Sequence, residues 1–148
     1  MGQQQLLLVI LVTIIVGIAT VVAINTFGAA ADSANVDAVR QDLASIGASA
    51  QGFYMKPAML GGGNRTFTDI TFGDIAFGAQ VTAGTGDDPD EARNDNGTYT
   101  LAPVAQFILV TANPASGGEI QARICPDTIV MGAYAETGTV TAPGDCPG

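Results

Sequence analysis

The feature that most constrains this chain is an apolar run near its beginning, residues 6–24, which reads LLLVILVTIIVGIATVVAI. The run has no charge and no proline, and only Thr13, Gly17 and Thr20 dilute its aliphatic side chains. A helix rising about 1.5 Å per residue would be roughly 28 Å long here, close to the roughly 30 Å hydrocarbon layer of a bilayer. Because such a helix is apolar on every side, it needs lipid or other protein around it and does not suit the surface of a soluble domain.

The residues on either side of this run carry no topology signal. Residues 1–5 read MGQQQ, the first acidic residue is Asp32 and the first basic residue is Arg40. A secretory signal peptide has a basic segment before its apolar core, and a membrane anchor carries Lys or Arg on its cytoplasmic flank. We therefore expect a basic leader to precede the mature chain and to be removed, leaving the mature end at Met1 or Gln3.

Beyond the apolar run the pattern becomes that of a half-buried helix. Apolar residues follow one another at spacings of 3 and 4 and form a single stripe: Val36, Val39, Leu43, Ile46, Ala50 and Phe53. Lys56-Pro57 ends this helix, because proline disfavours helix in the residue before it. We expect one continuous helix of about fifty residues, with a break near Gly17 or within residues 28–32 as the alternative, and the stripe lying on the rest of the domain.

Residues 56–148 have the composition of a β-sheet. Short runs rich in β-branched and aromatic residues are bounded by Gly, Pro, Asn or Asp; these predicted strands are residues 66–72, 75–81, 98–101, 105–111, 119–124 and 128–134. Residues 113–118, NPASGG, should turn the fourth run back onto the fifth as a hairpin. The predicted fold class is therefore α+β, a long N-terminal helix packed on a C-terminal antiparallel sheet.

This pattern divides the chain into two parts. Residues 1–31 are the hydrophobic helix, and residues 32–148 are an outer globular domain. That domain combines the amphipathic half of the helix, residues 32–55, with the β-rich part, residues 56–148.

Charge and composition exclude several classes of function. The formal net charge is −9, with five basic residues and no histidine, which argues against nucleic acid as a partner and against docking on anionic membrane surfaces. Without histidine there is no Ser-His or Cys-His pair for nucleophilic catalysis, and no glycine-rich phosphate motif is present. We expect no enzyme, no catalytic residues and no cofactor.

The two cysteines, Cys125 and Cys146, do not have the spacing of a metal motif. In an exported protein an even pair indicates a disulfide, which would stabilise the fold by roughly 3 kcal/mol for a loop of about twenty residues. Two unpaired thiols in a cytosolic protein are the alternative.

The stretch of residues 86–97, GDDPDEARNDNG, concentrates carboxylates. Oxygen-rich loops bind Ca²⁺. The candidate ligands of a weak calcium site here are Asp87, Asp88, Asp90 and Asp95. The spacing does not fit the EF-hand pattern, so a solvated acidic loop without metal is the other interpretation.

Two segments match the N-glycosylation pattern, at Asn64 and at Asn96. Both also have the composition of turns. Asn64 follows three glycines, and Asn96-Gly97 is a signal for a type I′ turn. Glycan acceptor and plain turn are the two hypotheses at each position.

The order of these segments resembles that of a type IV pilin-like subunit: a few polar residues, an uncharged aliphatic helix, an amphipathic helix and a β-rich remainder. The sequence GQQQLLLVILVTIIVGIA is similar to the processed N-terminal ends of a group of bacterial pilin-like proteins. The resemblance is specific over residues 2–54 and architectural beyond them. One departure is the glutamate that most type IV pilins carry at the fifth mature position, where this chain has Gln5 or Leu7, depending on the mature start.

The resemblance implies a structural subunit of an extracellular, cell-surface filament that resides in the inner (cytoplasmic) membrane before assembly. The implied partners are copies of the chain in a helical homopolymer, that membrane, a pilus-assembly machinery and a leader peptidase. The residues expected to form the assembly core are Leu6, Leu7, Leu8, Ile10, Leu11, Ile14, Ile15, Ile18, Val21 and Val22. The alternatives are a single-span membrane protein with an outer binding module and a minor pilin-like component of a secretion system.

Overall fold

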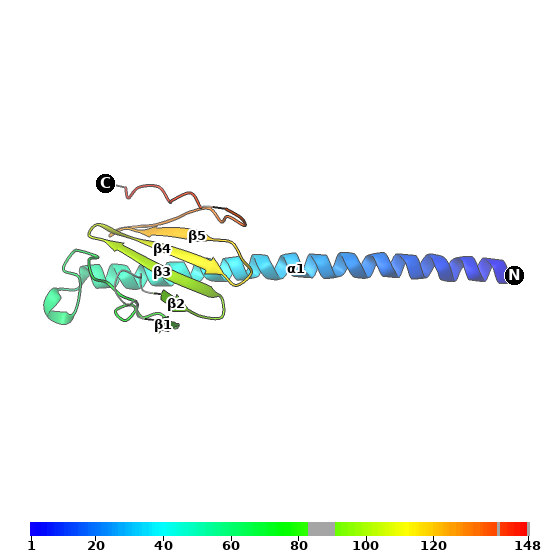
Figure 1. Ribbon diagram of the computed structural model, residues 1–148, viewed down its shortest axis with the longest axis horizontal. Helices are drawn as coiled ribbons and strands as arrows, with labels where there is room; N and C mark the ends of the chain where they lie inside the picture. Colours follow the sequence, from blue (N-terminus) through cyan, green and yellow to red (C-terminus); the bar gives the residue numbers. More distant parts are fainter. Residues whose placement is uncertain (83–90, 139, 148) are drawn as a thin grey trace. The chain divides into compact units, whose positions relative to one another are not determined.

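The computed structural model describes residues 1–82, 91–138 and 140–147. Its helices are α1 (Gly2–Met55) and the short 3₁₀ helix η1 (Ala58–Leu60). The described strands are β1 (Gln80–Thr82), β2 (Glu91–Arg93), β3 (Gly97–Val104), β4 (Phe107–Pro114), β5 (Ile120–Ile124) and β6 (Ile129–Met131) (Figure 1). The chain divides into two compact units, Met1–Ala34 and Asn35–Gly148. One long N-terminal helix contacts a six-stranded antiparallel sheet, which confirms the predicted α+β class.

Helix α1 runs without interruption through Gly17 and Gly28. A glycine inside a helix costs about 1 kcal/mol relative to alanine, and neither glycine breaks the helix. The helix ends at Met55, just before Lys56-Pro57, as predicted. The expectation of one continuous helix is therefore confirmed, and the alternative of a break at residues 28–32 is wrong.

The sheet is an antiparallel meander in which each strand pairs with the next along the chain. The predicted hairpin is confirmed, because β4 and β5 pair in antiparallel register with Thr111 opposite Gln121. β3 extends to Val104, which lies opposite Phe107. The two residues between them turn the chain, so the strand predicted to begin at residue 105 begins at Phe107.

Two predicted strands are wrong. Residues 66–72 and 75–79 form turns and irregular structure, and of the second run only Gln80 and Val81 enter a strand. Within the first run Asp69 has a positive φ angle of 64°, which a strand does not accommodate. Its backbone also forms local hydrogen bonds such as Ile70 N to Phe67 O (3.3 Å). The apolar side chains of this segment are nevertheless buried, namely Phe67, Ile70, Phe72 and Ile75. The sequence pattern therefore predicted correctly that these side chains are buried, and predicted their backbone conformation incorrectly.

The ends of the sheet also differ from the prediction. Residues 91–93, which the sequence placed in an acidic loop, form β2 between β1 and β3. The last strand is β6, only three residues long, although residues 128–134 were predicted.

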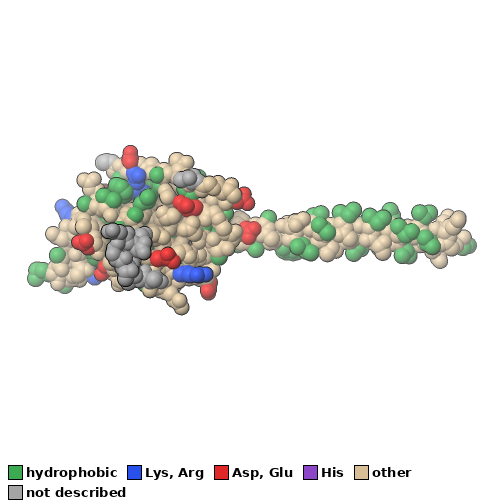
Figure 2. All heavy atoms as spheres, viewed as in Figure 1, with side chains coloured by type: hydrophobic (Ala, Val, Ile, Leu, Met, Phe, Trp, Pro, Cys, Tyr) green, Lys and Arg blue, Asp and Glu red, His purple; other side chains and the backbone are tan. Residues whose placement is uncertain are grey.

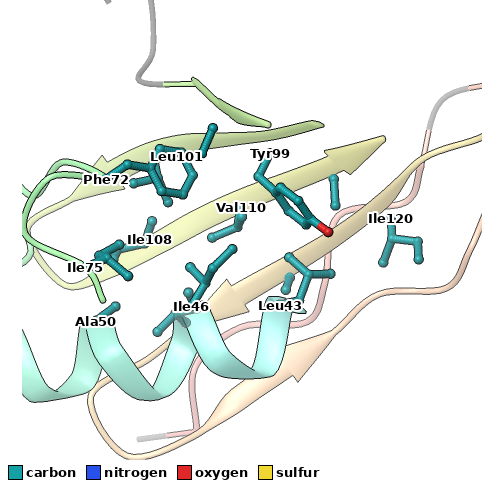
Figure 3. Close-up of a cluster of buried hydrophobic side chains, with 14 of the residues drawn as sticks. Leu43, Ile46, Ala50, Phe72, Ile75, Tyr99, Leu101, Ile108, Val110 and Ile120 are labelled. Carbon is teal, nitrogen blue, oxygen red and sulfur yellow. The ribbon is translucent and has the colours of Figure 1, made fainter. Parts of the chain in front are cut away.

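The core of the second unit lies between α1 and one face of the sheet. Five residues of the predicted stripe are buried in this core: Val36, Val39, Leu43, Ile46 and Ala50. The sixth, Phe53, is partly buried and packs against the core. The strands bury alternate residues: Tyr99 and Leu101 in β3, Ile108, Val110 and Ala112 in β4, and Ile120, Ala122 and Ile124 in β5. Figure 3 shows Leu43, Ile46 and Ala50 projecting from the helix toward the side chains of the sheet.

Gly47 determines how closely the helix approaches the sheet. It is buried within the helical stripe, and a Cβ atom at this position would collide with the side chain of Ile129 in β6. The absence of a side chain therefore lets β6 pack directly on the helix.

The C-terminal segment is attached to the sheet at two neighbouring points. The predicted disulfide Cys125–Cys146 is present, with Cα atoms 5.8 Å apart. Arg123 forms a salt bridge with Asp145, and its guanidinium lies 4.6 Å from the centre of the Phe107 ring. A covalent bond and an ion pair thus hold the same stretch of the tail.

Candidate assembly surface

The apolar run of α1 forms the largest uncovered hydrophobic surface of the described chain. Its large aliphatic residues are 47–68% exposed from Leu6 to Ile24, and Phe27 is 76% exposed. Figure 2 shows hydrophobic side chains following this part of the helix. All ten residues predicted for an assembly core lie on this surface. The helix is also long and apolar enough to cross a membrane.

The threonines within this surface do not interrupt its apolar character. Thr13 donates its hydroxyl hydrogen bond to the carbonyl of Ile10 over 2.8 Å. Thr20 bonds to Val16 and Thr26 to Val22 over the same distance. A hydroxyl that is satisfied within its own helix can be removed from water at little cost. The surface is therefore suited to a dry environment.

Asn35, at the start of the second unit, connects the helix to two turns of the sheet. Its Oδ1 accepts hydrogen bonds from the backbone N (3.1 Å) and the hydroxyl (2.9 Å) of Ser116, in the β4–β5 turn. Its Nδ2 donates to the carbonyl of Asn96 over 3.0 Å, in the β2–β3 turn. One side chain thus attaches both turns to the helix where the apolar surface ends. Sequence reasoning missed this contact, because nothing distinguishes Asn35 from any other polar helical residue.

A polar cluster around Asp42 attaches the same β2–β3 turn to the helix a second time, seven residues after Asn35. The Nδ2 atoms of Asn94 and Asn96 each donate to Asp42 Oδ2 over 2.8 Å. The hydroxyl of Tyr99 donates to the same oxygen over 2.6 Å. Three donors converge on one carboxylate oxygen, and sequence reasoning did not find the cluster because Asp42 lies more than fifty residues from each donor.

This arrangement shifts the pKa values of both titratable groups. Burial raises the pKa of the Asp42 carboxyl, but the hydrogen bonds from Asn96, Tyr99 and Asn94 outweigh it and hold the pKa below its ordinary value. Burial, the hydrogen bond to Asp42 and the charge of Asp42 raise the pKa of Tyr99 well above its ordinary value. The cluster thus favours an ionised aspartate beside a neutral tyrosine over the physiological range.

The β2–β3 turn, which contains Asn96, is stabilised by the side chain of Asn94. Asn94 Oδ1 accepts hydrogen bonds from the backbone N of Asn96 (2.9 Å) and of Gly97 (3.1 Å). None of residues 95–97 has a positive φ angle, so the type I′ turn predicted at Asn96-Gly97 is wrong. Gly97 is needed for a different reason, because a Cβ there would collide with the backbone carbonyl of Asn113.

The two predicted glycan acceptors lie in different surroundings. Asn64 is exposed, with a left-handed φ of 50°. Asn96 is half-buried, and its amide nitrogen donates to Asp42. Glycosylation at either position stays a prediction.

Of the four predicted calcium ligands, Asp87, Asp88 and Asp90 lie outside the described residues. Asp95 is exposed in the β2–β3 turn. Within the described ranges no three carboxylate or cysteine side chains come together at metal-binding distances. The calcium hypothesis stays a prediction.

We compared the chain with protein families, curated proteins and solved structures. No protein-family model, curated protein or solved structure matches this chain. The architecture is nevertheless pilin-like: a long apolar N-terminal helix, an antiparallel sheet packed on the helix, and a C-terminal disulfide.

Proposed function

We propose that this chain is the structural subunit of an extracellular pilus-like filament, held together by packing of the apolar part of α1 against copies of itself. The observation that carries the proposal is the exposure of every large aliphatic residue from Leu6 to Ile24. The second unit has a complete core of its own. The apolar surface therefore needs a partner outside the chain.

The size of that surface explains why it does not remain in water. Fully burying a Val, Leu or Ile side chain is worth roughly 1.5–3 kcal/mol. The fourteen large aliphatic residues from Leu6 to Ile24 are already partly covered by the helix, and at about half of that value they contribute on the order of 15 kcal/mol. Exposing the surface to water is therefore strongly disfavoured.

The proposed mechanism is a change of surroundings for one helix. Before assembly the apolar part of α1 lies in the membrane, and in the filament it packs against the same helices of other subunits. Lipid tails and aliphatic side chains are equally apolar, so moving the helix from lipid to a protein core changes its hydrophobic free energy little. Close packing between helices therefore has to drive the transfer. The role is structural, and the second unit forms the outer surface of the filament.

The second candidate function is a membrane-anchored outer module. The observation in its favour is that α1 is long and apolar enough to span a bilayer. In that case the helix stays in lipid, and a single charge within it is tolerated as long as insertion succeeds.

The substitution Ile15→Asp separates the two functions. Its cost in a membrane helix is about 3 kcal/mol on insertion scales, so insertion can survive. In a filament every copy would bury the same charge among aliphatic side chains, and the nearest basic residue in the sequence is Arg40. We expect filaments to disappear from sheared surface material in electron micrographs while the protein remains in the membrane fraction.

The matched control is Ile15→Val, which keeps the position apolar and should leave filament yield unchanged. Circular dichroism of both purified variants checks that the second unit is folded. Filaments of normal yield from Ile15→Asp would refute the proposal and favour the anchored module.

A further inference from the structure

The fold holds the two segments that match the N-glycosylation pattern in very different ways. The first segment, residues 64–66, lies in the turn that follows η1, outside the sheet. Asn64 is exposed there. The hydroxyl of Thr66 lies 2.7 Å from that of Thr68, in an exposed contact. The two groups that the pattern requires, an asparagine amide and a hydroxyl two residues later, are therefore both at the surface.

This first segment can open without disturbing the sheet. Asn64 N donates to Lys56 O over 3.0 Å, and Arg65 N donates to Tyr54 O over 2.9 Å. Asn64 and Arg65 have φ angles of 50° and 66°, in the left-handed region that is unfavourable for residues with a side chain. Opening the turn breaks short-range hydrogen bonds within residues 54–66 and relieves this backbone strain, so an enzyme can bind the segment in an extended form.

The second segment, residues 96–98, is fixed in the fold. Asn96 Nδ2 donates to Asp42 Oδ2 over 2.8 Å, and the carbonyl of Asn96 accepts from Asn35 Nδ2 over 3.0 Å. Thr98 lies in β3, which pairs with β2 on one side and with β4 on the other. An enzyme that binds this segment has to break the Asp42 cluster and unpair a strand inside the sheet.

The disulfide and the apolar helix indicate where such an enzyme meets the chain. A structural disulfide is typical of an oxidising compartment outside the cytoplasm, and Cys125–Cys146 is one. Asparagine-linked glycans of exported proteins are attached in such compartments, from a donor that is itself a membrane lipid. Helix α1 is long and apolar enough to hold the chain at that membrane.

We propose that Asn64 is an N-glycosylation site and that the fold excludes Asn96 from the same reaction. The co-reactant is a lipid-linked, phosphate-activated oligosaccharide, and a membrane-bound oligosaccharyltransferase is the partner. Nδ2 of Asn64 forms a bond to C1 of the first sugar, and the bond from C1 to the phosphate oxygen breaks. The phosphate leaves with that electron pair, and the replaced Nδ2 proton passes to solvent. The inference does not rest on the proposed filament.

Mass spectrometry of the full-length chain isolated from its native host tests the site. We expect peptides that contain Asn64 to carry the mass of a glycan on that residue, and peptides that contain Asn96 to carry none. In the same host, Thr66→Ala should lose the added mass and Thr66→Ser should keep it, because the pattern accepts either hydroxyl. The matched control is Thr98→Ala, which removes the hydroxyl of the second segment and should leave the added mass unchanged.

Three results would overturn the inference: Asn64 without added mass in the chain from its native host, added mass on Asn96, and added mass that persists in Thr66→Ala. None of these bears on the proposed function, which fails if sheared surface material contains no filaments. The two failures are therefore distinguishable.

A second experiment tests whether the fold makes the selection. Full-length chain produced without a transferase is incubated with membranes of the native host, which supply the enzyme and its donor. One sample is folded in detergent, and the other is reduced, unfolded in urea and diluted directly into the membranes. We expect glycan only on Asn64 in the folded sample and on both Asn64 and Asn96 in the unfolded one. Modification of Asn96 in the folded sample, or of Asn64 alone in the unfolded one, would contradict the role of the fold.

Discussion

The hydrogen bond between Tyr99 and Asp42 offers a quantitative test of how the helix is attached to the sheet. Tyr99→Phe keeps the buried ring and removes only the hydroxyl, which donates to Asp42 Oδ2 over 2.6 Å. Hydrogen bonds to charged groups are worth about 1.5–3 kcal/mol. Asp42 keeps its two bonds from Asn94 and Asn96, so it is not left unpaired. We therefore expect a loss of about 1.5–2 kcal/mol, at the lower end of that range.

For a unit of this size such a loss lowers Tm by about 6–8 °C. The measurement is thermal unfolding of the full chain in detergent, followed by near-UV circular dichroism. The matched control is Tyr134→Phe, whose hydroxyl donates to the neutral carbonyl of Gly117 over 3.0 Å. That change should cost about 1 kcal/mol or less.

The pH dependence of stability gives a second readout of the same bond. Because the pKa of Asp42 is lowered in the fold, its contribution is present above the ordinary value of 3.8 and is lost as pH falls below it. Because the pKa of Tyr99 is raised, its contribution is present below the ordinary value of 10.0 and is lost as pH rises above it. We expect Tm to fall between pH 9 and 11 more steeply in the unmodified chain than in Tyr99→Phe.

Two results would refute this reasoning. One is a Tm in Tyr99→Phe that equals that of the unmodified chain at pH 7. The other is an alkaline decline of the same slope in both proteins. Either would mean that the Asp42 cluster contributes little to holding the β2–β3 turn on the helix.

Two further predictions concern the second unit. Cys146→Ser should lower its stability by roughly 3 kcal/mol and speed hydrogen exchange in residues 140–147, which the salt bridge of Asp145 alone would not hold; unchanged exchange in that segment would show that the disulfide is not what orders it. Gly47→Ala should destabilise by up to about 2 kcal/mol, because the collision of its Cβ with the Ile129 side chain costs about 1–3 kcal/mol and the gain in helix propensity offsets about 1 kcal/mol of that. Gly52→Ala, which meets open space, should stabilise by up to about 1 kcal/mol. Denaturant unfolding measures both glycine variants, and equal midpoints for the two would contradict the close approach of β6 to the helix.

Patterns within a short stretch of sequence predicted the local features of this fold well. The spacing of Val36, Val39, Leu43, Ile46 and Ala50 identified the buried face of α1, because helical periodicity is a property of neighbouring residues. Lys56-Pro57 identified its end, and the turn-forming residues 113–118 identified the β4–β5 hairpin. In each case the physical cause acts over a few residues.

Conformation that depends on distant partners was predicted poorly. The run that contains Phe67 and Phe72 is rich in aromatic and β-branched residues, as a strand would be. Both side chains are nevertheless buried from turns, because the core accepts an apolar side chain from any backbone. β2 was missed because two of its three residues, Glu91 and Arg93, are charged, and the strand is defined by its pairing with β1 and β3.

The sequence by itself determined that this chain carries a helix that cannot stay in water, since nineteen uncharged residues are apolar on every face whatever surrounds them. It also determined the helical stripe that covers a sheet. Only the tertiary structure decided which side chains hold that sheet in place. Asn35 and Asp42 lie on the helix, while Asn94, Asn96, Tyr99 and Ser116 come from the strands and turns. Hydrogen bonds depend on direction and on distances near 3 Å, so they exist only after the hydrophobic core has brought these distant segments together.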